Sequence, residues 1–121
     1  MVLLRLRANH SGFDAERLER GFQALADGTR RAVIARLTKG EASVADLAAP
    51  FDIALPSFLQ HVRVLEAAGL ITTEKQVGVR MCRLEAQRLG ELERWISGYQ
   101  AAWRTRLDRL GDILGRKGDM Q

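Results

Sequence analysis

The side chains best suited to chemistry in this sequence lie between residues 54 and 83, and that chemistry is hydrogen bonding to a polyanion. Ser57, Gln60 and Arg63 follow one another at three-residue intervals, which places them on one face of a helix. These groups are short or planar and polar, so they can reach base edges and phosphates. His61 lies on the flank of this face. The pattern predicts a helix that binds double-stranded DNA.

The element that must position these groups is a helix over residues 54–69. Phe58, Val62 and Leu65 recur at helical spacing on its other side and predict a buried face. Gly69 ends the segment, as a glycine just past a helix usually does. One face of this helix is therefore expected in the core and the polar face in solvent.

A basic β-hairpin is predicted directly after this helix. Two strands, 70–75 and 79–84, flank a short turn and carry Lys75, Arg80 and Arg83. A polar-faced helix followed by a basic hairpin is the arrangement of a winged helix-turn-helix. We therefore assign residues 70–85 to the wing.

Three shorter helices are predicted upstream. The first runs from about Asp14 to Ala26, the second begins after Asp27, and Ser43 opens a third with Asp46 three residues later. A short helix, a brief turn and a polar-faced helix form the helix-turn-helix pattern, here over residues 43–69. The residues expected to face inward on these helices are Leu18, Phe22, Leu25, Val33, Ile34, Leu37, Val44, Leu47 and Phe51.

The last segment, residues 86–114, is predicted to be one long helix of roughly 40 Å. Its apolar residues fall within one arc, whose edge Arg88 and Arg106 interrupt. A stripe longer than the body beneath it predicts a second protomer, and the alternative is a helix that folds back on its own chain. The expected dimer contacts are Phe22, Leu92, Trp95, Tyr99, Trp103, Leu107 and Leu110.

Length and charge are consistent with this assignment. The chain of 121 residues is expected to form one domain over 1–121, mainly α with a β-hairpin wing, of about five helices and two strands. Lys and Arg outnumber Asp and Glu by 19 to 15, which suits a polyanionic partner. Arg30, Arg31, Arg36 and Lys39 fall in a stretch without acids. We expect Arg31 to contact a phosphate, although these residues also suit a solvated face.

Several classes of function find no support in the sequence. Cys82 is the single cysteine, so we expect no internal disulfide, and a packed residue is favoured over a redox sensor. No run is long enough to cross a membrane, and Met1–Arg7 is too short for a signal peptide, so a cytoplasmic protein without a membrane partner is expected. No catalytic triad, glycine-rich phosphate loop or acid pair is evident, so we expect neither an enzyme nor a cofactor.

Two other hypotheses remain open. A winged-helix module can bind a protein rather than DNA, but such a module has no need of the basic wing and polar helix face present here. A regulator can also respond to a small molecule, and Trp95, Tyr99 and Trp103 could line its site, although a dimer core is the favoured explanation for them. The sequence does not identify an effector.

Taken in order, four segments resemble the ArsR-type bacterial transcriptional regulators. They are residues 24–31, 43–48, 55–71 and 79–84, and the set is more specific than any one of them. The resemblance implies a homodimeric winged-helix repressor that acts on an inverted-repeat operator, often of its own operon. It also implies dimerisation through the helices at 13–26 and 86–114.

The chain departs from the family pattern at four places. Gly28 stands where a proline is usual, Leu59 where a serine is common and Val62 where a leucine is usual. At the wing tip, Val77-Gly78 replaces the common Gly-Arg pair. Operator preference therefore cannot be transferred from relatives. The residues expected to contact DNA are Ser57, Gln60, His61, Arg63, Lys75, Arg80 and Arg31. For His61 the alternative is a ring packed beside Val64 and Leu65.

Many ArsR-type proteins bind metals, and this sequence argues against that role. Such sites need thiolates on the third helix, or histidines and carboxylates along the last one. Here the third helix has no cysteine and the last helix has no histidine; the two histidines are His10 and His61. We therefore expect no metal site.

Overall fold

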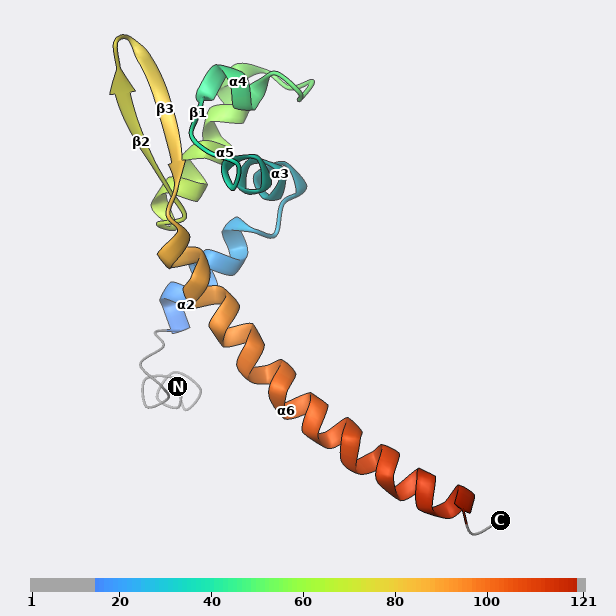
Figure 1. The fold of residues 1–121 in the computed structure, drawn as a ribbon. Coiled ribbons are helices and arrows are strands. Elements are labelled where there is room, and N and C mark those ends of the chain that lie inside the picture. The colour runs from blue at the N-terminus through green and yellow to red at the C-terminus, as the bar shows by residue number, and fades with distance from the viewer. Residues whose placement is uncertain (1–14, 120–121) are drawn as a thin grey trace.

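The computed structural model describes residues 15–119, and the side chains of residues 15–115. Within that range the chain forms five helices and one three-stranded antiparallel sheet, which confirms the predicted winged helix-turn-helix (Figure 1). The elements are α2 (Ala15–Ala24), α3 (Gly28–Leu37), β1 (Ala42–Ser43), α4 (Val44–Ala48), α5 (Leu55–Ala67), β2 (Ile71–Gln76), β3 (Val79–Leu84) and α6 (Ala86–Asp119). The predicted start of the first helix, at residues 13 and 14, lies outside the described residues.

The helix ends follow local rules that the sequence carries. The Asp27 carboxylate accepts a hydrogen bond from the Arg30 amide at 3.1 Å and caps α3. The Ser43 hydroxyl caps α4 by accepting from the Asp46 amide at 3.0 Å. Gly69 has a positive φ of 77° just beyond α5, the conformation that lets the last turn close and the chain reverse. Each of these ends was predicted from residue type.

The core lies where α2, α3, α4 and α5 meet the sheet and the first turns of α6. On α5 the buried residues are Phe58, Val62 and Leu65, as predicted. Phe51 contributes an aromatic contact, with its ring centroid 5.6 Å from that of Phe58. The polar face of α5 is consequently held outward by the packing of its apolar face.

The sheet has the strand order β1-β3-β2, one strand more than the sequence predicted. β1 consists of two residues and pairs Ala42 with Cys82 of β3. The wing hairpin closes through a two-residue turn, Val77-Gly78, in which both residues have positive φ. Positive φ at both positions is the signature of a tight hairpin turn that matches strand twist.

α6 leaves the body as a single helix and projects into solvent, with its C-terminal end far from the other elements (Figure 1). It ends at Asp119 rather than at residue 114, and its length is about 50 Å. The alternative that this helix folds back on its own chain is therefore wrong. The large apolar side chains exposed along it are Ile96, Tyr99, Trp103, Leu107, Leu110, Ile113 and Leu114.

Two residues at the start of α6 differ from expectation. Leu92 is only 2% exposed and packs against α2, where a Cβ on Gly21 would approach its methyl groups to 2.7 Å. It has no surface left for a second chain, so the prediction of Leu92 as a dimer contact is corrected. Arg88, expected at the edge of the stripe, is 5% exposed and belongs to the interior.

Candidate nucleic-acid interface

The exposed face of α5 carries the polar groups that the sequence singled out. Ser57, Gln60 and Arg63 are all exposed. The Arg63 guanidinium donates a hydrogen bond to the Gln60 side-chain oxygen at 3.1 Å, which holds the two planar groups side by side. Planar amide and guanidinium groups are the ones that pair with adenine and guanine edges in the major groove. Their contact with DNA remains a prediction.

The N-terminus of α5 differs from those of α3 and α4 because no side chain caps it. Ala54 occupies the cap position and makes no side-chain hydrogen bond, and a proline follows in the first turn. Backbone amides that no side chain satisfies can bind a phosphate. Leu55, which the sequence-based prediction of DNA contacts did not include, is 54% exposed in this turn and offers an apolar surface for a thymine methyl.

His61 lies toward the junction of α2 and α3. The Arg30 guanidinium, which can only donate, donates a hydrogen bond to the His61 Nδ1 at 3.1 Å. An Asp27 carboxylate oxygen lies 3.7 Å from the same nitrogen. The structure thus gives His61 a structural partner, and DNA contact through its other nitrogen remains a prediction.

Asp27 itself is held in its charged form at this junction. The hydrogen bond from the Arg30 amide, together with the nearby His61 and Arg30 side chains, lowers the pKa of the Asp27 carboxyl. Partial desolvation opposes this effect. The cap of α3 and the flank of α5 therefore share one electrostatic cluster.

Two arginines of α3, Arg30 and Arg31, bind the end of α2. Arg30 donates to the carbonyl of Ala24 at 2.6 Å and to that of Gln23 at 3.1 Å. Arg31 donates to the carbonyl of Leu25 at 2.8 Å and is exposed. Guanidinium groups at the last carbonyls of a helix satisfy orphan acceptors and complement the helix dipole. The phosphate contact predicted for Arg31 remains a prediction.

The wing places its basic residues across from one another and is anchored to α5. Lys75 and Arg80 are partners in the β2–β3 register, and both are exposed. Arg80 donates to the Thr73 hydroxyl at 3.0 Å, and that hydroxyl donates to the Glu66 carboxylate of α5 at 2.8 Å. This relay fixes the wing against the helix.

Cys82 lies in the interior of the sheet. It is buried, and desolvation raises the pKa of its thiol, with a smaller contribution from Glu66. A thiol in that environment is not activated as a thiolate. This supports a packing role for Cys82.

Metal-binding clusters and membrane-spanning helices are both absent from residues 15–119. No group of three or more His, Cys, Asp and Glu side chains in that range is arranged to hold a metal ion. No helix there is both long enough and apolar enough to cross a membrane.

Comparison with known proteins agrees with this geometry. A family model described as a helix-turn-helix domain matches residues 25–74. The HTH-type transcriptional regulator Rv2034 of Mycobacterium tuberculosis is 32% identical over 101 residues, or 84% of this chain and 92% of the relative. The transcriptional repressor SdpR of Bacillus subtilis is 33% identical over 55 residues, or 46% of this chain and 61% of the relative.

A solved structure extends the comparison to the fold. The crystal structure of an ArsR family transcriptional regulator is 48% identical, with a TM-score of 0.71 over 76% of this chain and 95% of that one. The match spans 92% of Rv2034 and 95% of the ArsR family structure. The chain therefore belongs to the ArsR family of winged helix-turn-helix transcriptional regulators.

Proposed function

We propose that this regulator is a homodimeric repressor that binds an inverted-repeat operator, in its own operon, within the bacterial cytoplasm. The observation that carries the proposal is the separation of two unsatisfied surfaces: the polar face of α5 and the apolar stripe of α6. The first suits DNA and the second suits a protein partner. That SdpR is named a transcriptional repressor supports repression as the outcome.

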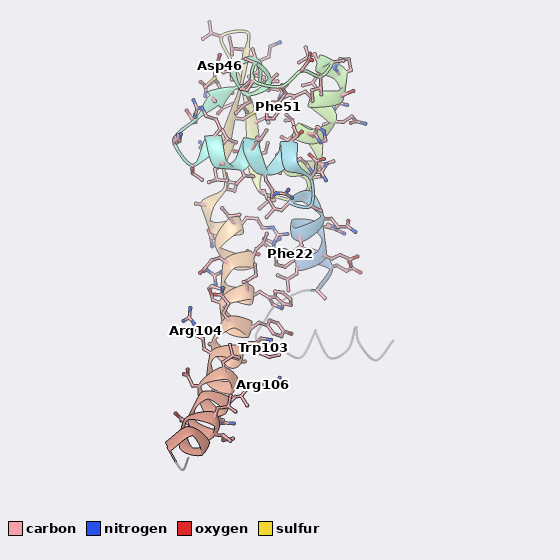
Figure 2. All side chains as sticks on the ribbon, turned by 90° about the vertical axis from the view of Figure 1, so that its right-hand side faces the viewer. Phe22, Asp46, Phe51, Trp103, Arg104 and Arg106 are labelled. Carbon is pink, nitrogen blue, oxygen red and sulfur yellow. The ribbon has the colours of Figure 1, made fainter. Side chains whose placement is uncertain are left out.

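The apolar stripe of α6 is the argument for a dimer. Trp103 and Leu107 are 57% and 58% exposed, in a helix that projects beyond the body. Most of the stability of a helix in a protein comes from packing of its apolar face, and a contiguous exposed apolar patch favours association. Figure 2 shows Trp103 on the side of α6 opposite Arg104. A second copy of the chain that covers this side would bury the apolar patch and supply the packing that the projecting helix lacks.

The spacing along the stripe favours an antiparallel arrangement of the two α6 helices. Apolar residues lie four and seven positions to either side of Trp103, so two antiparallel helices centred there match along their length. Arg94 then lies opposite Asp112 of the partner subunit, whereas a parallel pair would bring like charges together. Gly111 of the partner subunit lies opposite Trp95 and leaves room for the indole.

The DNA-facing side follows from the α5 geometry. With α5 in the major groove, Gln60 and Arg63 reach base edges, and the uncapped N-terminus of α5 meets the phosphate backbone. Lys75 and Arg80 on the wing lie at the adjacent backbone. Two such units related by a two-fold axis contact half-sites about one turn of DNA apart, or a multiple of that distance.

An anisotropy titration against the DNA upstream of the gene tests this proposal. We expect affinity well above that for a random duplex, with log K falling linearly as log salt rises. Gln60→Ala should relax base preference, whereas Arg80→Ala should weaken all sequences alike. Equal binding of operator and random DNA at moderate salt would favour the protein-interaction module instead.

The proposed regulator needs no metal. After dialysis against zinc or nickel, elemental analysis should find no stoichiometric ion, because soft ligands are too few in the sequence. One tightly held ion per protomer would contradict this, and would direct attention to an intersubunit site at Cys82 or His61.

A further inference from the structure

Arg88, near the start of α6, is the one charged residue buried in the described part of the chain. Burying a guanidinium has a large desolvation cost, which close and well-directed partners must offset. The lower end of α5, the start of α6 and α2 come together in the fold (Figure 1). Arg88 forms hydrogen bonds with the end of α5 and with α2 at this junction. Its partners therefore show what the burial accomplishes.

The Arg88 guanidinium binds three different elements. Its Nε donates to the Ala68 carbonyl at the end of α5 at 2.9 Å, and Nη2 donates to the Arg17 carbonyl in α2. Nη1 donates to the Glu91 carboxylate one turn along α6 at 3.0 Å. Glu91 in turn accepts two hydrogen bonds from the Arg17 side chain, at 2.9 and 3.0 Å. One planar group thereby joins the DNA-facing helix to both helices at the predicted dimer interface.

The contact at Ala68 has a specific physical basis. Ala68 is the C-cap of α5, so its carbonyl has no partner within the helix and lies at the negative end of the helix dipole. A cation there is favourable, and the fork of a guanidinium fixes the direction of each bond. Gly21 allows this close approach, since an added Cβ there would lie 3.3 Å from the Arg88 side chain.

We propose that Arg88 is a positioning residue that sets the placement of α5 relative to the dimer helices, and thereby the half-site spacing that the dimer accepts. The inference rests on the proposed dimeric repressor. In such a dimer, α6 fixes the two protomers to each other and α5 contacts the bases. Arg88, which belongs to α6, donates a hydrogen bond to the end of α5 and so links the two helices. Loosening it should leave half-site recognition intact and relax the spacing.

Selection from a library of random duplex DNA tests this even though the operator is unidentified. Full-length wild type and Arg88→Lys are taken through the same rounds, and the recovered half-sites and spacer lengths are compared. A lysine keeps the charge but cannot donate to the Ala68 and Arg17 carbonyls in one plane. We expect the same half-site sequence from both proteins, and a wider distribution of spacers from the variant.

Titrations with the selected repeat then quantify the effect. One added base pair rotates a half-site by about 35° relative to the other. The preference of wild type for the best spacer over this longer one should fall by about threefold or more in Arg88→Lys. Arg104→Lys is the matched control, because it makes the same replacement at an exposed position of α6 (Figure 2) and should leave the preference unchanged.

A second variant covers the case in which Arg88→Lys fails to fold. Glu91→Gln keeps an oxygen that can accept from Arg88 but removes the charge, and should widen the spacer distribution by a smaller amount. Unchanged spacing in a folded Arg88→Lys, or in Glu91→Gln when the first variant is unfolded, would overturn the role of Arg88. If wild type itself selects no repeat, the proposed function fails, and the spacing inference fails with it.

Discussion

The two halves of α6 have the same helical form but opposite surroundings. In residues 86–95 the helix lies on the body, with Leu92 and Arg88 buried and Trp95 packed against Phe22 at a ring separation of 5.4 Å. From Ile96 onward the large apolar side chains are exposed. Figure 2 shows Trp103 beyond the end of the body, while Phe22 lies alongside the first half.

This difference separates folding from association along one element. The first half is stabilised by contacts within its own protomer, so its residues should govern the free energy of unfolding. The large apolar side chains of the second half are exposed, and Tyr99 packs against Trp95 of the same helix at a ring separation of 4.6 Å. The stability of this half should therefore depend on a partner, and so on protein concentration. Substitutions in the two halves should consequently change different measurements.

The largest effect is expected from charges in the second half. Replacing Trp103 and Leu107 together by Glu should abolish the dimer, because four carboxylates would meet at its centre. Operator affinity should fall about a hundredfold or more, because each half-site would then bind without the effective concentration that linkage provides. Analytical ultracentrifugation gives the mass and anisotropy the affinity. A wild-type monomer at micromolar concentration with full operator binding would exclude the dimer.

A truncation in each half sharpens the contrast. Leu92→Ala should lower the free energy of unfolding by about 2–5 kcal/mol, because it leaves a cavity against α2. Leu107→Ala removes the same atoms from an exposed site and should instead weaken dimerisation. Chemical denaturation at high protein concentration, and sedimentation on dilution, measure the two quantities. Equal losses in both assays for both variants would show that the halves are not separable.

Hydrogen exchange should distinguish the halves in the wild-type protein. On dilution, amides in residues 100–115 should exchange faster, because the helix there loses its covering partner. Amides in residues 86–95 should keep their protection, since the body still covers them. Exchange that is independent of concentration in both segments would contradict the proposed interface.

The smallest effect concerns the acid stability of the first half. Hydrogen bonds from the Arg17 side chain, and then from Arg88, lower the pKa of the Glu91 carboxyl in the folded chain. Its ionised form therefore adds stability at pH above the ordinary glutamate value, and this contribution is lost as pH falls through the lowered folded value. Thermal unfolding of Glu91→Gln should show a shallower loss of stability in acid than wild type. If the stability of both proteins fell equally with decreasing pH, the Glu91 carboxylate would make no contribution to the stability of the fold.

Local patterns predicted most of the fold. Phe58, Val62 and Leu65 specify the buried face of α5 through their spacing alone, and the caps at Asp27 and Ser43 depend on residues three positions apart. What the sequence did not predict depends on distant partners. β1 is only two residues long and exists through its pairing with β3.

In the candidate site, too, local patterns predicted some features and distant partners determine the others. The exposed face of α5 follows from periodicity, but the partners of His61 and Arg88 lie far away in the chain. Arg30 precedes His61 by 31 residues, and Arg17 precedes Arg88 by 71. Sequence spacing placed Arg88 at the edge of the apolar arc and did not predict its burial, because no helical pattern reports which carbonyls another helix brings to it. The burial of a charge is a property of the assembled fold.

The tip of the wing has a consequence for protein engineering. Val77 occupies the first turn position with a φ of 49°, in the left-handed region that a β-branched side chain rarely adopts, and it is fully exposed there. The hairpin therefore closes despite its turn residue, held by the paired strands on either side. An asparagine at this position would complete the Asn-Gly pair that such turns favour. The tip of the wing is therefore a position where a substitution can raise thermostability without altering the core, α5 or α6.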